Sequence, residues 1–124
     1  NNSDLLFLKK FSKSRICLHK NINSKVHEMI IFHKKGISIE PHFHQKAESL
    51  IMLSGKMEVK IFNSLGKIID TFIMTEYKKG RLNTTFLYKF EKNVIHSQYF
   101  FEDSIFKEVS LGPFKNNNTM KAIF

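Results

Sequence analysis

The sequence predicts an all-β protein in which short antiparallel strands form a sandwich or a barrel. Apolar and polar residues alternate with a period of two over several segments, which places one side of each segment in a core. Turn-forming residues recur about every ten residues. No long segment has the apolar spacing of an amphipathic helix, and only Asp4–Lys13 has a pattern compatible with a helix. These three observations favour an antiparallel sandwich or barrel over a helical or mixed fold.

Seven segments are predicted as strands, two from a clear alternation of apolar and polar residues and five from a less regular apolar pattern. The alternation is clearest at Lys56–Ile61 and at Phe86–Phe90, which are predicted as half-buried strands. Further strands are predicted at Val26–His33, Ser49–Leu53, Ile68–Met74, Ile95–Phe101 and Ile105–Leu111. Turns are predicted at Lys34–Gly36, Asn63–Gly66, Lys78–Gly80 and Glu102–Ser104, and a loop at Asn116–Asn118. The chain then divides into an N-terminal arm (1–20), one β-domain (21–114) and a C-terminal tail (115–124).

Length and composition limit the class of protein. The chain has 124 residues, of which 42% are hydrophobic and 25% charged, as expected for one folded domain with one core. No run of about 18 apolar residues is present, so no membrane span is predicted. Residues 1–10 lack the apolar stretch of a signal peptide, and the single Cys17 cannot form an internal disulfide. A cytoplasmic location is therefore expected.

The net charge favours anionic partners without identifying one. The formal charge is +9, which suits nucleic acids, phosphorylated metabolites or acidic surfaces. The lysines are spread along the chain and form no block, and only Arg15 and Arg81 are arginines. A surface of solvated lysines is the preferred interpretation, so neither a nucleic acid nor a membrane is expected as a partner.

Four residues have the side chains and the spacing of a metal site. His42 and His44 lie two positions apart, so in a strand their imidazoles point to the same side. Glu48 follows four residues later and offers an oxygen ligand, while His96 lies in a distant alternating segment. Such a set with an open coordination position is typical of a catalytic metal site, because structural zinc sites are usually closed by thiolates.

The spacing around these residues resembles the first motif of the cupin superfamily. Six positions of that motif are present: Gly36, Pro41, His42, His44, Glu48 and Gly55. The second cupin motif is altered, because Glu91 and Asn93 stand where proline and glycine are usual, and only its histidine, His96, is kept. Asparagine tolerates a positive φ better than most residues, so Asn93 is expected to make the same turn. The resemblance implies a single cupin-type antiparallel β-barrel or jelly roll with a short N-terminal arm.

Within the superfamily, the chain is similar to the WbuC family of cupin-fold metalloproteins from Arg15 to Phe114. The similarity lies at Arg15, His19, Glu40–His44, Lys46–Glu48 and Gly112–Phe114. It implies that His42, His44, Glu48 and His96 bind one divalent metal ion, with zinc, iron, manganese and nickel all open. It also implies a context of O-antigen and other surface-polysaccharide biosynthesis.

Three other residues are candidates for contacts with a substrate. Arg15 is either a clamp for a carboxylate or phosphate, and so a catalytic or substrate-binding residue, or the partner of an ion pair that fixes the arm. His19 is either a general acid or base or a hydrogen-bonded loop residue. Gln98 is a substrate-binding candidate because it shares a strand face with His96. His27 and His33 are expected to face solvent.

Several functions are compatible with these residues. The first is a metal-dependent enzyme on a sugar or nucleotide-sugar, in which the ion acts as a Lewis acid for isomerisation, epimerisation or lyase chemistry. The alternatives are an iron-dependent dioxygenase, a non-catalytic sugar- or metal-binding or regulatory module, and a metal-free epimerase. The small-molecule substrate is expected to be anionic. Phe100 and Phe101 place aromatic rings on both faces of one strand, which predicts a homodimer as one outcome.

Overall fold

A computed structural model describes residues 10–113 and 119–124, and these residues form strands and no helix. The strands are β1 (Lys13–Cys17), β2 (Val26–His33), β3 (Ser38–His44), β4 (Glu48–Ser54), β5 (Lys56–Phe62), β6 (Ile68–Thr75), β7 (Leu87–Phe90), β8 (Ile95–Phe100), β9 (Ser104–Leu111) and β10 (Thr119–Lys121). Accordingly, no helix in the described part of the chain is long and apolar enough to cross a membrane.

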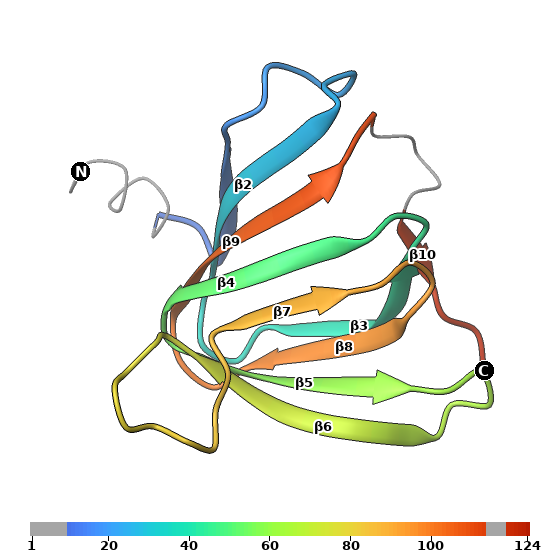
Figure 1. Ribbon diagram of the computed structural model, residues 1–124. Coiled ribbons are helices and arrows are strands. Elements are labelled where there is room, and N and C mark those ends of the chain that lie inside the picture. Colours follow the sequence, from blue (N-terminus) through green and yellow to red (C-terminus); the bar gives the residue numbers. More distant parts are fainter. Residues whose placement is uncertain (1–9, 114–118) are drawn as a thin grey trace.

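The strands form two five-stranded sheets that face each other (Figure 1). The first sheet has the order β1-β2-β9-β4-β7 and the second the order β10-β3-β8-β5-β6. All pairs of neighbouring strands are antiparallel. The predicted all-β jelly-roll architecture is confirmed, and it takes the form of a sandwich because the two sheets do not close into a barrel.

The predicted strands are found within one residue of their expected ends. The edge strands β1 and β10 were not predicted, and β3 was expected only as the strand assumed to carry His42 and His44. β1 lies in the segment expected to be an N-terminal arm and pairs with β2, and β10 lies in the expected tail and pairs with β3. Both are short and largely exposed, so their extended conformation depends on pairing with the neighbouring strand more than on their own sequences. The segment Asp4–Lys13 lies largely outside the described residues, and Lys13 begins β1. The loop at 116–118 lies wholly outside them.

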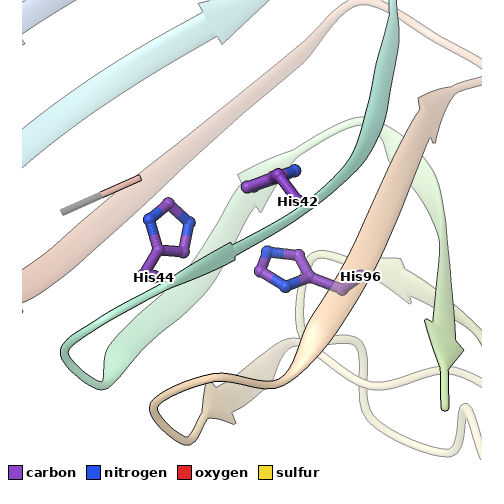
Figure 2. A group of neighbouring side chains, drawn as sticks. All are labelled: His42, His44 and His96. Carbon is purple, nitrogen blue, oxygen red and sulfur yellow. The ribbon is translucent and has the colours of Figure 1, made fainter. Parts of the chain in front are cut away.

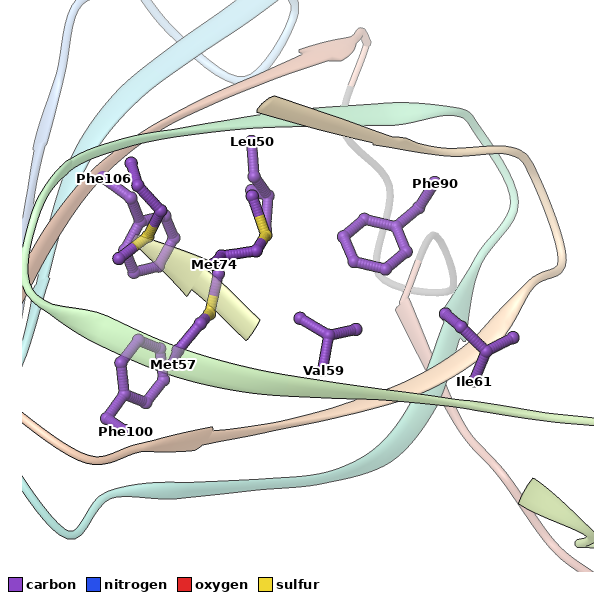
Figure 3. Packing of buried hydrophobic residues seen from close by; sticks show 9 residues of the cluster. Leu50, Met57, Val59, Ile61, Met74, Phe90, Phe100 and Phe106 are labelled. Atoms are coloured by element: carbon purple, nitrogen blue, oxygen red, sulfur yellow. The ribbon is translucent and has the colours of Figure 1, made fainter. Parts of the chain in front are cut away.

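The core lies between the two sheets and follows the period-two pattern of the strands. Figure 3 shows the packed side chains, which come from both sheets. Met57 and Val59 of β5, on the inner side of one sheet, are fully buried, as is Met74 of β6 beside them. Phe90 and Phe106 face them from the opposite sheet. Each such side chain stabilises the fold by about 1.5–3 kcal/mol through removal of apolar surface from water.

The turn between β4 and β5 depends on Gly55. This residue has a φ of +95°, in the left-handed region that favours glycine. A Cβ atom at this position would lie 2.6 Å from the Cα atom of Ser104 and 2.5 Å from the carbonyl oxygen of Asp103. The Ser104 hydroxyl accepts a hydrogen bond from the backbone N–H of Lys56 (3.1 Å) and donates one to the carbonyl of Glu102 (2.8 Å). The absence of a side chain therefore lets the β4–β5 and β8–β9 connections, both of which run between the two sheets, pack closely.

The expectation that His27 and His33 face solvent is wrong. Both lie on the inner side of β2, and His27 is only 3% exposed and stacks on His19 with ring centroids 4.0 Å apart. His33 stacks on Phe100 with centroids 4.6 Å apart. The expectation rested on the absence of a carboxylate at ligand spacing, which carries no information about burial. Both histidines have the parity of Ile31, which packs against the core, and so lie on the inner side of β2.

Stability should depend on pH through His33. Its Nδ1 is buried and has no hydrogen-bond partner, and burial, assisted by the charge of Lys13, lowers its pKa from 6.5 to about 4. Between about pH 6.5 and pH 4, His33 is therefore protonated in the unfolded chain and neutral in the folded chain. The free energy of unfolding is expected to fall as the pH is lowered through this window. Urea unfolding at pH 7 and pH 5 measures it.

The variant His33→Phe keeps an aromatic ring against Phe100 and removes the titrating group. It is expected to lose less stability than the natural chain between pH 7 and pH 5. Equal losses in the two proteins would show that His33 does not contribute to the pH dependence.

Candidate metal centre

The register of β3 against β8 brings two distant histidines opposite each other. The pairing shifts between Ile39 and His42, and this irregularity includes Pro41. Proline has no backbone N–H to donate, so it is tolerated where the ladder is interrupted. After the shift, His42 pairs directly with His96. The sequence motif thus places one imidazole on each of two neighbouring strands at the same level.

The turn before β8 has the conformation expected from the altered second motif. Asn93 has a φ of +65°, which confirms that asparagine makes the turn that glycine usually makes there. Its backbone N–H donates a hydrogen bond to the carbonyl of His44 (2.8 Å). The turn and the end of β3 are therefore tied together beside the histidines.

Three imidazoles converge on one space (Figure 2). The ring centroids of His42 and His96 lie 4.3 Å apart, those of His42 and His44 4.9 Å, and those of His44 and His96 5.5 Å. One ligand nitrogen from each ring lies within 4.8 Å of the other two. This spacing allows a single ion to contact all three nitrogens after small rotations of the rings.

The Nδ1 atoms of the three rings are already occupied. Those of His42 and His96 lie 2.8 Å and 3.0 Å from the backbone carbonyl oxygen of the residue two positions earlier. A carbonyl only accepts, so each Nδ1 carries the proton and leaves a lone pair on Nε2. His44 Nδ1 lies 2.9 Å from the hydroxyl of Thr119 on β10. Such contacts at the far nitrogen orient metal-binding histidines in proteins.

The Nε2 atoms of His44 and His96 are buried and have no hydrogen-bond partner. Burial lowers the pKa of His44 to about 4 and that of His96 to about 3, with the charge of His42 as the next contribution to both. These two rings are therefore neutral at physiological pH, the form that binds a metal. An unpaired buried nitrogen costs free energy, and a divalent ion bound there would satisfy it. The three rings fit a divalent transition metal ion.

Glu48, the fourth predicted ligand, lies beside this group without being part of it. It is buried, and its Oε2 atom lies 3.4 Å from His44 Nε2. Burial raises the pKa of Glu48, and a hydrogen bond with Glu108 and the charge of Glu108 raise it further. Since His44 and Glu48 both favour their neutral forms, their contact is not a salt bridge in the metal-free chain. A bound cation would favour the carboxylate of Glu48 and so add an oxygen ligand.

Glu108 is a polar residue of the site that the sequence analysis missed. It lies on β9, which pairs with β4 so that Glu108 is opposite Leu50 and Ser110 is opposite Glu48. The signal was available in the alternation of β9, because Glu108 has the same parity as the buried Phe106. A charged residue on the core side of a strand requires a partner or a function.

A cavity of about 130 Å³ opens next to His44 and Glu48. Arg15 of the edge strand β1 and Lys46 of the turn after β3 line it, together with Glu108. The structure thus brings Arg15 to the same space as two of the predicted metal ligands. Arg15 and Glu48 come from the first sheet and His44 from the second.

The other two substrate candidates lie elsewhere. His19 Nδ1 lies 3.2 Å from both the carbonyl and the N–H of Glu28, so this ring belongs to the packing between the β1–β2 connection and β2. It does not line the cavity. Gln98 is 8% exposed on β8, two positions from His96, and it does not line this cavity either.

One family model matches the sequence. Residues 12–74 match the family described as Domain of unknown function (DUF6016). This region contains β1 to β5 and all but the last residue of β6, including His42, His44 and Glu48, and it ends before His96. No protein with curated annotation matches the chain.

Solved structures with cupin folds resemble the chain. Oxalate decarboxylase from Bacillus subtilis is 23% identical, with a TM-score of 0.65 over 88% of this chain and 27% of that enzyme. A cupin superfamily protein from Desulfitobacterium hafniense is 9% identical, with a TM-score of 0.62 over 80% and 76% of the two chains. A Klebsiella pneumoniae protein with a double-stranded β-helix domain is 15% identical, with a TM-score of 0.61 over 93% and 88%. At these identities the similarity shows the fold, and this chain spans about a quarter of oxalate decarboxylase.

Proposed function

The chain belongs to the DUF6016 family, and on that premise we propose that it is a cupin-fold metalloprotein that uses a divalent ion to act on a small oxygen-rich substrate. One observation carries the proposal. Three imidazoles are held through Nδ1 and converge on one space, and the Nε2 atoms of two of them are buried without a hydrogen-bond partner.

The residues His42, His44 and His96 would hold the ion, and Glu48 would complete the set as an oxygen ligand. A bound ion supplies Lewis-acid polarisation of a substrate oxygen. The cavity next to it has polar residues that are not needed as ligands, among them Arg15 and Glu108, which supports catalysis over storage of a metal. A module that only stores or senses the metal would not need them, whereas a substrate-binding module would.

The substrate class follows from the resemblance to the WbuC family and from the cavity. That resemblance supports a sugar or nucleotide-sugar of surface-polysaccharide biosynthesis, such as O-antigen, with isomerisation, epimerisation or lyase chemistry at the ion. The cavity of about 130 Å³ opens to the surface, so the reacting end of a nucleotide-sugar would lie inside and the remainder outside. The homodimer stays a prediction, which light scattering of the purified protein measures.

Elemental analysis of protein purified without a histidine tag and without added metal tests the proposal. We expect close to one equivalent of a divalent transition metal per chain, and its loss in the double variant His42→Ala/His44→Ala. Iron would direct assays to oxygen consumption, and zinc, manganese or nickel to isomerase and lyase assays on sugars. No metal after purification and none taken up on titration would refute the metalloprotein and leave the metal-free epimerase or a binding module.

A further inference from the structure

Two cationic side chains line the cavity beside the histidines, and neither has a carboxylate partner among the described residues. A guanidinium nitrogen of Arg15 has only the sulfur of Met29 as a contact, at 3.9 Å, which is a weak acceptor. The Lys46 ammonium donates to the backbone carbonyl of Gly112 at 2.7 Å. Carbonyl groups hold the ammonium in place without neutralising its charge.

The position of Arg15 is fixed by the register of the first sheet. Arg15 pairs with Ile31 of β2, which pairs with the buried Phe106 of β9. Paired residues lie on the same side of a sheet, so Arg15 points to the inner side although it is on the edge strand. Arg15 is exposed, as expected for an arginine on an edge strand. It nevertheless lines the cavity that His44 and Glu48 also line, so its guanidinium is accessible to a ligand from solvent.

We infer that Arg15, together with Lys46, forms a subsite for the carboxylate of an oxygen-rich substrate whose neighbouring hydroxyl or carbonyl oxygen faces His44 and the metal site. This inference rests on the proposed function and narrows its substrate class to carboxylated molecules. The planar fork of a guanidinium matches the two oxygens of a carboxylate. A small hydroxy acid and the acidic end of a sugar share this chemistry, and either could place its carboxylate in the cavity that Arg15 and Lys46 line.

Binding measurements on metal-loaded protein test the subsite with glycolate as the probe. Ethylene glycol is the matched compound without a carboxylate, and it is expected to bind at least about tenfold more weakly. The variant Arg15→Gln is expected to weaken glycolate binding at least about tenfold with unchanged metal content, because charge-assisted hydrogen bonds are lost. Arg15→Lys keeps the charge without the fork and should be intermediate.

Arg81→Gln provides the matched control, since Arg81 is the other arginine of the chain and donates to Thr75 outside this cavity. Its glycolate affinity should equal that of the natural chain. Equal glycolate affinity in Arg15→Gln and the natural chain would refute the subsite. Inorganic phosphate that binds more tightly than glycolate, and through Arg15, would also refute the assignment to a carboxylate.

The source of the carboxylate is tested with glucuronate, with glucose as its neutral counterpart. Tighter binding of glucuronate than of glycolate assigns the subsite to acidic sugars, and the reverse order assigns it to small hydroxy acids. Metal content is measured in the same samples, so a failure of the metal site is distinguished from a failure of the subsite. If the natural chain holds no metal, glycolate binding that depends on Arg15 in the metal-free protein still supports the subsite, and its absence refutes it.

Discussion

Replacing His44 by alanine is expected to abolish stoichiometric metal binding and to leave the sandwich folded. His44 contributes one of three converging nitrogens, and loss of residues that only orient a ligand already costs 10–100-fold in affinity. Loss of the ligand itself should therefore cost more than about a hundredfold. The hydrophobic cluster does not include His44, so the free energy of unfolding of the metal-free protein should change by about 1 kcal/mol or less. Elemental analysis and urea unfolding measure the two effects.

The variant His19→Ala is the control for His44→Ala. His19 is a partly buried histidine whose Nδ1 contacts the backbone of Glu28, outside the converging group. It should retain the full metal content. Metal retained by His44→Ala would show that the ion binds elsewhere. Cooperative unfolding of His44→Ala at ambient temperature would show that the histidines are part of the structural core.

The substitution Gly55→Ala is expected to destabilise the protein by about 3–5 kcal/mol, a large part of the stability of a small domain. A positive φ costs a non-glycine residue about 1 kcal/mol or more. The new Cβ would also lie 2.6 Å from the Cα of Ser104, and backbone cannot move aside as a flexible side chain can. The connection between β8 and β9 would have to shift. The midpoint of urea unfolding measures the loss.

Gly36→Ala separates the two contributions. Gly36 has a φ of +90°, but a Cβ atom there would have no atom within 4 Å. Its substitution should cost about 1 kcal/mol, from backbone conformation alone. Equal losses at Gly55 and Gly36 would contradict the steric explanation. A loss at Gly55 that is two or more kcal/mol larger supports it.

Local sequence signals were sufficient for the inner strands and for the histidines. Alternation of apolar and polar residues identified strands such as β5, because the period of two and the apolar side that becomes buried can both be recognised within one short segment. The spacing of His42 and His44 predicted that their rings share a side, and the structure confirms it. Asn93 was correctly expected to make a turn at positive φ.

The features that were missed depend on contacts between distant segments. β10 has three residues, too few to show a period, and exists through its pairing with β3. The buried position of His27 follows from its stacking on His19, which the strand pattern does not encode. The parity of Glu108 in β9 was visible in the sequence, but its contact with Glu48 on the neighbouring strand was not.

The contact between His44 and Thr119 has a consequence for the order of events during folding. It joins residues 75 positions apart, and the centre also requires His96 from a third segment. Pairings of this kind form late, because the loss of chain entropy on closing long loops precedes any gain from the contact. The centre is therefore completed after the two sheets have assembled. A metal ion would then be captured by a finished scaffold, in contrast to small zinc domains, in which the metal itself drives the chain to fold.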